Sequence, residues 1–409
     1  MLVGKAPSGL GYAVKRSGRS VGYCSLTIKC GTRDEDGFHS GIAHFAEHTI
    51  FKGTARKSAR VINSYLDRLG GDLNAFTTKE EIVLQATVLK EDLGKAAGLL
   101  LELATSPAFP EDDIEIEKGV VIDEIGSYKD SPSEEVYDKF EETLLAGHPL
   151  ARPILGTTAS VRKITRQELI RFRDKRFTPG NMALSIVADI DERKLEREVL
   201  RLSEKVFDGS WAESAERILQ PVDGPAVFNK RVDKRNHEVN AVIGGLAPSL
   251  YDKEERFTAI LLANILGGPA SNSKLNDLLR ERNGWVYGVE TSYTQYSDTG
   301  VMAITLGCDR SNLDKCLKGV EKVLRKMQDD PLSDSALKAS KKQLLGQLAI
   351  SSDNGETQCL SMGKSLVSFG AVASEESNRA AIEAVTAERI RDAARKIFGP
   401  GTLSSLIFL

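Results

Sequence analysis

Long apolar runs, excess charge and basic stripes are all missing from this chain of 409 residues. No stretch approaches the roughly 18 apolar residues that a membrane-spanning helix needs, so we expect no membrane partner. The formal net charge is only −3, and no run of basic residues with interleaved aromatic residues occurs. A nucleic-acid partner is therefore not expected. The hydrophobic content of 41% and the charged content of 28% are ordinary for a soluble globular protein.

Cysteine is scarce too, with five thiols and no metal-finger spacing among them. Cys24 and Cys30 fall in a strand-like segment and are expected to be buried thiols rather than ligands. Residues 1–8 show no charged start followed by an apolar run, so no secretory signal is visible. A cytoplasmic location is the simplest expectation.

The length exceeds the size at which a single core stops growing, which favours two domains. Branched or alternating apolar runs predict strands, and helical spacing predicts helices between them. Together they predict an α+β fold of mixed α/β layers, in which helices cover a mixed sheet. The predicted strands are 23–28, 82–88, 183–187, 239–244 and 301–307, and the predicted helices include 59–69 and 166–177.

Histidine is also scarce, with five in the chain, and two of them are four positions apart in His44-Phe45-Ala46-Glu47-His48. On a helix each residue advances by about 100°, so His44, Glu47 and His48 share one face. Two imidazoles can then hold one Zn²⁺ while the carboxylate takes a proton from water. The alternative is a solvated His-Glu pair on a helix surface. The scarcity of histidine makes a chance match rare and favours the zinc hydrolase.

A third ligand is required, because catalytic zinc usually has three protein ligands. Glu117 and Glu124 are seven residues apart, about two helical turns, and face the same way on a helix. From the residues alone, an amphipathic helix whose acids face water explains this pair equally well.

Residues 31–54, which contain this motif, closely resemble the pitrilysin family of zinc peptidases, in particular its bacterial branch that is like the mitochondrial processing peptidase. Further family-like stretches are 70–77, 148–150, 154–156 and 178–182. The resemblance implies that His44, His48 and Glu124 bind zinc, that Glu47 is the general base, and that Glu117 supports the site. It also implies that Asn74, Ala75 and Phe76 form an edge strand that pairs with an extended peptide substrate. A plain surface strand is the alternative for these three residues.

The chain also repeats itself. A helical pattern at 93–103, a break at 106–110 and a helix at 117–125 recur as 313–324, 330–332 and 340–348. At an offset of 223 residues, Val121 and Ile125 align with Leu344 and Leu348, so apolar positions persist. We therefore predict two homologous domains, an N-terminal zinc-binding domain at 1–210 and a C-terminal domain at 225–409. The predicted linker is 208–224, which contains Gly209, Ser210 and Pro221.

The second copy lacks the metal residues. The same offset puts Ser340 opposite Glu117 and Gln347 opposite Glu124, and the region around 256–262 has no histidine pair. One zinc per chain is therefore expected.

The segment 279–287 resembles a family segment whose arginine and tyrosine bind the substrate and the transition state, and Arg280 and Tyr287 match that pair. An arginine can donate a forked pair of hydrogen bonds, and a tyrosine hydroxyl can donate to a developing oxyanion. A surface arginine and a core tyrosine are the alternative.

The resemblance implies a closed chamber of four such domains, which admits short or unfolded peptides. We expect a homodimer in which Arg280 and Tyr287 act in trans, with a heterodimer as the alternative. The predicted activity is zinc-dependent endopeptidase, and the competing function is a non-catalytic scaffold subunit. A zinc hydrolase of small amides is a weaker third possibility, because it would not need so long a repeated chain.

Overall fold

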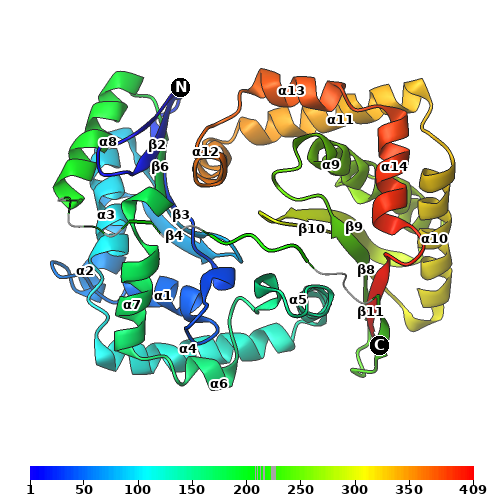
Figure 1. The fold of residues 1–409 in the computed structure, drawn as a ribbon, viewed down its shortest axis with the longest axis horizontal. Coiled ribbons are helices and arrows are strands. Elements are labelled where there is room, and N and C mark those ends of the chain that lie inside the picture. Colours follow the sequence, from blue (N-terminus) through cyan, green and yellow to red (C-terminus); the bar gives the residue numbers. More distant parts are fainter. Residues whose placement is uncertain (208, 210, 212, 215–216, 223–226) are drawn as a thin grey trace. The chain divides into compact units, whose positions relative to one another are not determined.

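The structure is a computed structural model that describes residues 1–207, 209, 211, 213–214, 217–222 and 227–409. The chain forms two compact units, and Figure 1 shows a sheet with helices in each. Unit 1 comprises 1–125, 152–217 and 350–373, and unit 2 comprises 126–151, 218–349 and 374–409.

Unit 1 contains a six-stranded mixed sheet in the order β1-β2-β6-β3-β5-β4. β2 and β6 pair in parallel and the other neighbours pair antiparallel. Every residue of β6 is buried, which fits a central strand covered on both faces. The strands are β1 (Leu2–Lys5), β2 (Gly11–Arg16), β3 (Val21–Ile28), β4 (Asp72–Thr77), β5 (Ile82–Leu89) and β6 (Met182–Ala188).

The two faces of this sheet are covered from different parts of the chain. α3 packs on β3 and β5, and α12 packs on β2, β3 and β6. The helices assigned to unit 1 are α1 (Ile42–Ile50), α2 (Ala59–Asn63), α3 (Leu93–Thr105), α4 (Glu111–Lys129, to Ile125), α6 (Thr158–Val161), α7 (Arg166–Arg176), α8 (Glu192–Val206) and α12 (Gly355–Phe369).

Unit 2 repeats this plan with five strands in the order β7-β11-β8-β10-β9. β7 and β11 pair in parallel, as β2 and β6 do, and α5 packs on β8 and β11. The strands are β7 (Asn229–Val232), β8 (Val239–Ala247), β9 (Val286–Gln295), β10 (Gly300–Cys308) and β11 (Ser404–Phe408). The helices are α5 (Pro132–Leu144), α9 (Lys253–Gly267), α10 (Leu313–Asp329), α11 (Asp334–Ser352, to Ala349), α13 (Glu375–Glu383) and α14 (Ala387–Phe398).

The two units therefore share one topology, and the predicted mixed α/β fold is confirmed. α4 and α11 are both 19 residues long and begin 223 residues apart (334 − 111), which is the offset read from the sequence. The compact units nevertheless interleave along the chain, because α5 joins unit 2 and α12 joins unit 1. The division into 1–210 and 225–409 stays a prediction about homologous halves. Within the predicted linker, residues 208, 210, 212, 215–216 and 223–226 lie outside the described part of the chain.

The predicted strands and the helix at 166–177 are present, and each end lies within three residues of its predicted position. The prediction of one continuous helix at 59–69 was wrong. α2 ends at Asn63, and a single 3-10 turn at Asp67–Leu69 follows. At Ser64 the backbone leaves helical geometry, with φ −97° and ψ 1°, and its hydroxyl donates to the carbonyl of Arg60. Gly70 (φ 66°) then turns the chain toward β4.

All five cysteines are buried and free, as expected for Cys24 and Cys30. Within the described ranges, no helix has both the length and the apolar character needed to cross a bilayer.

Candidate metal centre

The helix α1 carries the histidine pair, and a glycine and a buried carboxylate fix its start. Gly41 precedes it with φ 89°, and a Cβ there would lie 2.7 Å from the carbonyl oxygen of Leu155. Only glycine suits this position. The buried carboxylate of Glu35 accepts the backbone N–H groups of Gly41 and Ala43 at 3.0–3.1 Å, in place of an N-cap side chain. Burial raises the pKa of Glu35 to about 8, against the two amide hydrogen bonds that lower it.

The predicted ligands converge in unit 1. Nε2 of His44 lies 3.7 Å from Oε2 of Glu124, and Nε2 of His48 lies 3.6 Å from the same oxygen. These distances exceed a hydrogen bond. Two ligands about 2.0–2.2 Å from one zinc ion at tetrahedral angles stand roughly 3.3–3.6 Å apart, so the spacing is what a shared ion requires.

The chemistry of the three groups also fits a cation. Oε2 of Glu124 is buried without a hydrogen-bond partner among the described residues, which is costly unless a cation or water binds it. Burial and the neighbouring His48 lower the pKa of His44 to about 3, so His44 is a neutral imidazole with a lone pair to offer. In the described part of the chain, these three residues form the one group of at least three metal-ligating side chains that lie close together.

Glu117 forms a hydrogen bond with Nδ1 of His48, the ring nitrogen that does not face Glu124. Its Oε1 lies 2.9 Å from Nδ1 of His48, and its Oε2 lies 2.6 Å from the Lys52 ammonium. Burial would raise the pKa of Glu117, but the hydrogen bonds from His48 and Lys52 outweigh it and hold this pKa below its ordinary value. The charged carboxylate fixes the tautomer that leaves Nε2 of His48 free to bind a metal.

Replacing Glu117 with glutamine should therefore weaken zinc binding by about 10- to 100-fold, because the oriented charged acceptor is lost. Competition with a chromogenic chelator measures the affinity. Glu115→Gln on the same helix is the matched control, since Glu115 is exposed and pairs with Lys118 on the surface of α4. Equal affinity of the Glu117→Gln variant and the wild type would contradict the supporting role.

Glu47 points to the same place from α1 and has a partner on β4. The Thr77 hydroxyl donates to Oε2 of Glu47 at 3.0 Å. Burial raises the pKa of the Glu47 carboxyl, while His48 and the Thr77 hydrogen bond oppose this. One oxygen is thus held in place, which leaves the other for proton transfer.

The predicted substrate strand lies where it was expected. Among the described strands β4 pairs with β5, and it is one of the two outer strands of the unit 1 sheet, with β1 at the other edge. Asn74 and Phe76 are exposed, and Ala75 between them is half-buried. Asn74 Oδ1 accepts the backbone N–H of Ala75 at 2.8 Å. The edge can pair with an extended peptide, although the structure assigns these side chains no substrate role.

Arg280 and Tyr287 lie in unit 2, whereas the three predicted ligands lie in unit 1. Arg280 is exposed in a short π-helical turn at Asn276–Glu281, and Tyr287 is 61% exposed near the start of β9. The Tyr287 hydroxyl donates to Oδ1 of Asp309 at 2.8 Å. Tyr287 is thus a surface residue and not a core tyrosine, which leaves its ring accessible.

The equivalent place in unit 2 is neutral. Nδ2 of Asn264 donates to Oε1 of Gln347 at 2.6 Å, so an amide hydrogen bond involves the residue that aligns with Glu124. Ser340, which aligns with Glu117, donates to the carbonyl of Ala336 within its own helix. An amide pair of this kind gives no anionic ligand for zinc.

Sequence reasoning missed Lys52, Thr77 and Glu35. Lys52 gave no signal for its contact with Glu117 on α4, and Thr77 showed only its position directly after the predicted substrate strand. Glu35 gave no signal, because its capping role depends on how the loop before α1 folds back.

Comparison with known proteins identifies the family of both halves of the chain. Residues 13–158 match the model of the insulinase family (peptidase family M16), and residues 163–344 match that of the peptidase M16 inactive domain. An uncharacterized zinc protease of Mycobacterium tuberculosis is 30% identical over 374 residues, which cover 90% of this chain and 84% of that protein. One of Bacillus subtilis is 29% identical over 372 residues, covering 91% and 89%.

Solved structures agree at the level of the fold. A protease from Helicobacter pylori superposes with a TM-score of 0.90 at 19% identity, covering 100% of this chain and 98% of that one. An M16-like peptidase from Alicyclobacillus acidocaldarius gives 0.89 at 20% identity, covering 100% and 97%. Because the two family models together match residues 13–158 and 163–344, this chain belongs to the M16, or pitrilysin, family of peptidases.

Proposed function

We propose that this chain is a zinc endopeptidase that cleaves short or unfolded peptides. The observation that carries the proposal is the grouping of His44, His48 and Glu124 beside the Glu47 carboxylate. The Nε2 atoms of the two histidines lie 3.6–3.7 Å from the same oxygen of Glu124. These three residues would hold one Zn²⁺, which when bound polarises water and the peptide carbonyl.

Glu47 then acts as the general base. Its free oxygen accepts the proton of the attacking water, and the same carboxyl later gives a proton to the leaving amine. The Thr77 hydroxyl keeps the other oxygen in place during both transfers. Because burial raises the pKa of Glu47, its affinity for a proton is higher than that of an exposed glutamate.

The substrate would bind as an added strand along β4, next to Asn74, Ala75 and Phe76. Main-chain hydrogen bonds to an edge strand accept any sequence in extended form. A folded protein cannot present such a segment, so this binding mode selects short or unfolded chains.

Arg280 and Tyr287 would complete the site from the partner subunit of a homodimer. The arginine can hold a substrate carbonyl or carboxylate, and the tyrosine hydroxyl can donate to the oxyanion. To do so, the Tyr287 hydroxyl must give up its hydrogen bond to Asp309 and donate to the substrate instead. A heterodimer with a degenerate partner is the alternative assembly.

Incubation with a mixed peptide library, with and without a chelator, tests the activity by mass spectrometry. We expect chelator-sensitive cleavage inside peptides and about one zinc per chain. The competing function, a non-catalytic scaffold subunit, predicts no stoichiometric zinc and no effect of changing Glu47.

Mixing two inactive variants tests the action in trans. Glu47→Gln and Tyr287→Phe subunits should together recover about a quarter of the wild-type activity, since half of the dimers are mixed and each has one complete site. Activity is measured before and after subunit exchange. Demonstrated mixed dimers without any recovery would contradict the arrangement in trans.

A further inference from the structure

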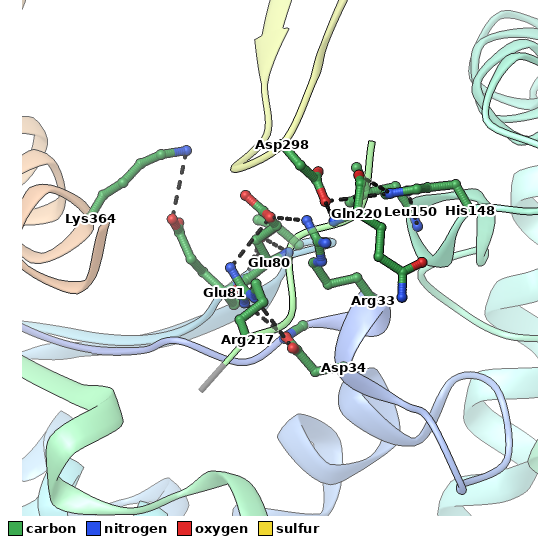
Figure 2. Close-up of polar contacts among 12 residues, drawn as sticks. Arg33, Asp34, Glu80, Glu81, His148, Leu150, Arg217, Gln220, Asp298 and Lys364 are labelled. Atoms are coloured by element: carbon green, nitrogen blue, oxygen red, sulfur yellow. Dashed lines mark hydrogen bonds and ion pairs between the residues drawn. The ribbon is translucent and has the colours of Figure 1, made fainter. Parts of the chain in front are cut away.

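Unit 1 contains a buried ion-pair cluster that the proposed reaction does not use directly. It consists of Arg33, Asp34, Glu80 and Arg217, whose side chains are between 2% and 9% exposed. Arg217 donates from Nη2 to Oδ2 of Asp34 at 2.8 Å and from Nε to Oδ1 at 3.3 Å, a forked pair. Figure 2 shows this cluster, with Glu80 joined to both arginines.

Glu80 is held by both its side chain and its backbone. Nη1 of Arg33 donates to Oε1 of Glu80 at 2.6 Å, and Nη1 of Arg217 lies 3.3 Å from the same oxygen. Nη2 of Arg217 also donates to the carbonyl oxygen of Glu80 at 2.6 Å. Removing one charge from a buried group of this kind leaves the others uncompensated.

The cluster joins the two segments that carry the general base and its partner. The backbone N–H groups of Thr32 and Arg33 donate to the carbonyls of Thr78 and Lys79 at 3.3 and 3.0 Å. On one side, residue 35 caps α1, which carries Glu47. On the other side, the turn at 78–81 directly follows Thr77 on β4. The Thr77–Glu47 hydrogen bond therefore spans the two segments that the cluster fastens together.

We propose that Arg217 is a positioning residue for hydrolysis. By clamping Asp34 and Glu80, it fixes the β4–β5 turn against the start of α1 and keeps the Thr77 hydroxyl on Glu47. The inference rests on the proposed role of Glu47. Arg217 is also the last residue of the 152–217 segment of unit 1, so the chain that leads into unit 2 contributes order to the site.

Arg217→Gln should lower kcat by about 10- to 100-fold, the usual effect of losing a residue that orients a reacting group. Zinc content should stay unchanged, and KM should change by less than about 3-fold, since no substrate contact is removed. Arg217→Lys should recover part of kcat, because it keeps the positive charge but cannot form the forked pair of hydrogen bonds to Asp34. Arg201→Gln is the control, since Arg201 pairs with Glu198 on the exposed surface of α8.

A double-mutant cycle separates positioning from general damage. In a Thr77→Val background, adding Arg217→Gln should lower kcat by no more than about 2-fold, because the group through which Arg217 acts is already gone. If the double variant lost kcat by the product of the two separate fold-losses, the proposal would be overturned.

Hydrogen exchange in the metal-free protein gives a readout that needs no activity. Backbone amides at 78–81 should exchange on the order of tenfold faster in Arg217→Gln than in the wild type. In Arg201→Gln their exchange rates should equal those of the wild type. Unchanged exchange in Arg217→Gln would overturn the inference, whereas a wild type that cleaves no peptide would overturn only the proposed function. Should Arg217→Gln not fold, faster exchange at 78–81 in Arg217→Lys supports the proposal and unchanged exchange overturns it.

Discussion

Replacing Glu47 with glutamine is expected to leave zinc bound and to lower kcat/KM for peptides by about 10²- to 10⁴-fold, the usual contribution of a general base. The amide is nearly isosteric and can still bond to Thr77, but it cannot accept a proton from water. Glu47 is not among the three residues whose ligand atoms cluster, so metal content should not change. Zinc analysis and steady-state kinetics on one fluorogenic peptide measure both quantities.

The control for this change is Glu115→Gln, which removes the same charge from an exposed position that pairs with Lys118. It should keep wild-type kinetics. Retained turnover in Glu47→Gln, at normal zinc content, would refute the assignment of the base and favour the scaffold function for this chain.

His48→Ala should lose both zinc and activity. It removes one of three ligands and also leaves the buried Glu117 carboxylate without its imidazole partner. We expect the metal content after dialysis to fall from about one zinc per chain to below about 0.1, and hydrolysis to fall to the background rate. Atomic absorption measures the metal, and circular dichroism shows whether the fold persists.

His237→Ala is the matched change, since His237 is exposed and lies in unit 2. It should retain full zinc. Normal occupancy in His48→Ala would contradict the ligand set, and addition of zinc to a folded but empty variant distinguishes lost affinity from lost structure.

Much of the fold could be predicted because its signals are local. β3, β5, β6, β8 and β10 are short runs of branched apolar residues, and their buried faces follow directly from that pattern. The repeat was visible because apolar residues recur at the same positions in both copies, although Leu348, which aligns with the buried Ile125, is 43% exposed. The prediction of a helix at 59–69 failed because the backbone leaves helical geometry at Ser64, which the apolar periodicity does not reveal.

The candidate site was predictable only in part, for a related reason. His44, Glu47 and His48 share one helix, so their spacing alone places them together. Glu124 was chosen by resemblance, since spacing alone fitted a solvated helix face equally well. Thr77 and Glu35 meet α1 through folded-back segments, and nothing in their immediate sequence indicates the contact.

The sequence by itself determined most of the elements and the face of α1 that offers two imidazoles and a carboxylate, since each follows from the periodicity of a single segment. It also determined the duplication, since the same pattern recurs 223 residues later. Only the tertiary structure decided that Glu124 reaches those imidazoles, that Glu117 binds both His48 and Lys52, and that Arg217 binds Glu80 in the turn after β4. These contacts join residues 65 to 137 positions apart, and they depend on how α1, α4 and the sheet pack in unit 1. Packing of that kind depends on the whole core and leaves no mark in any one stretch of sequence.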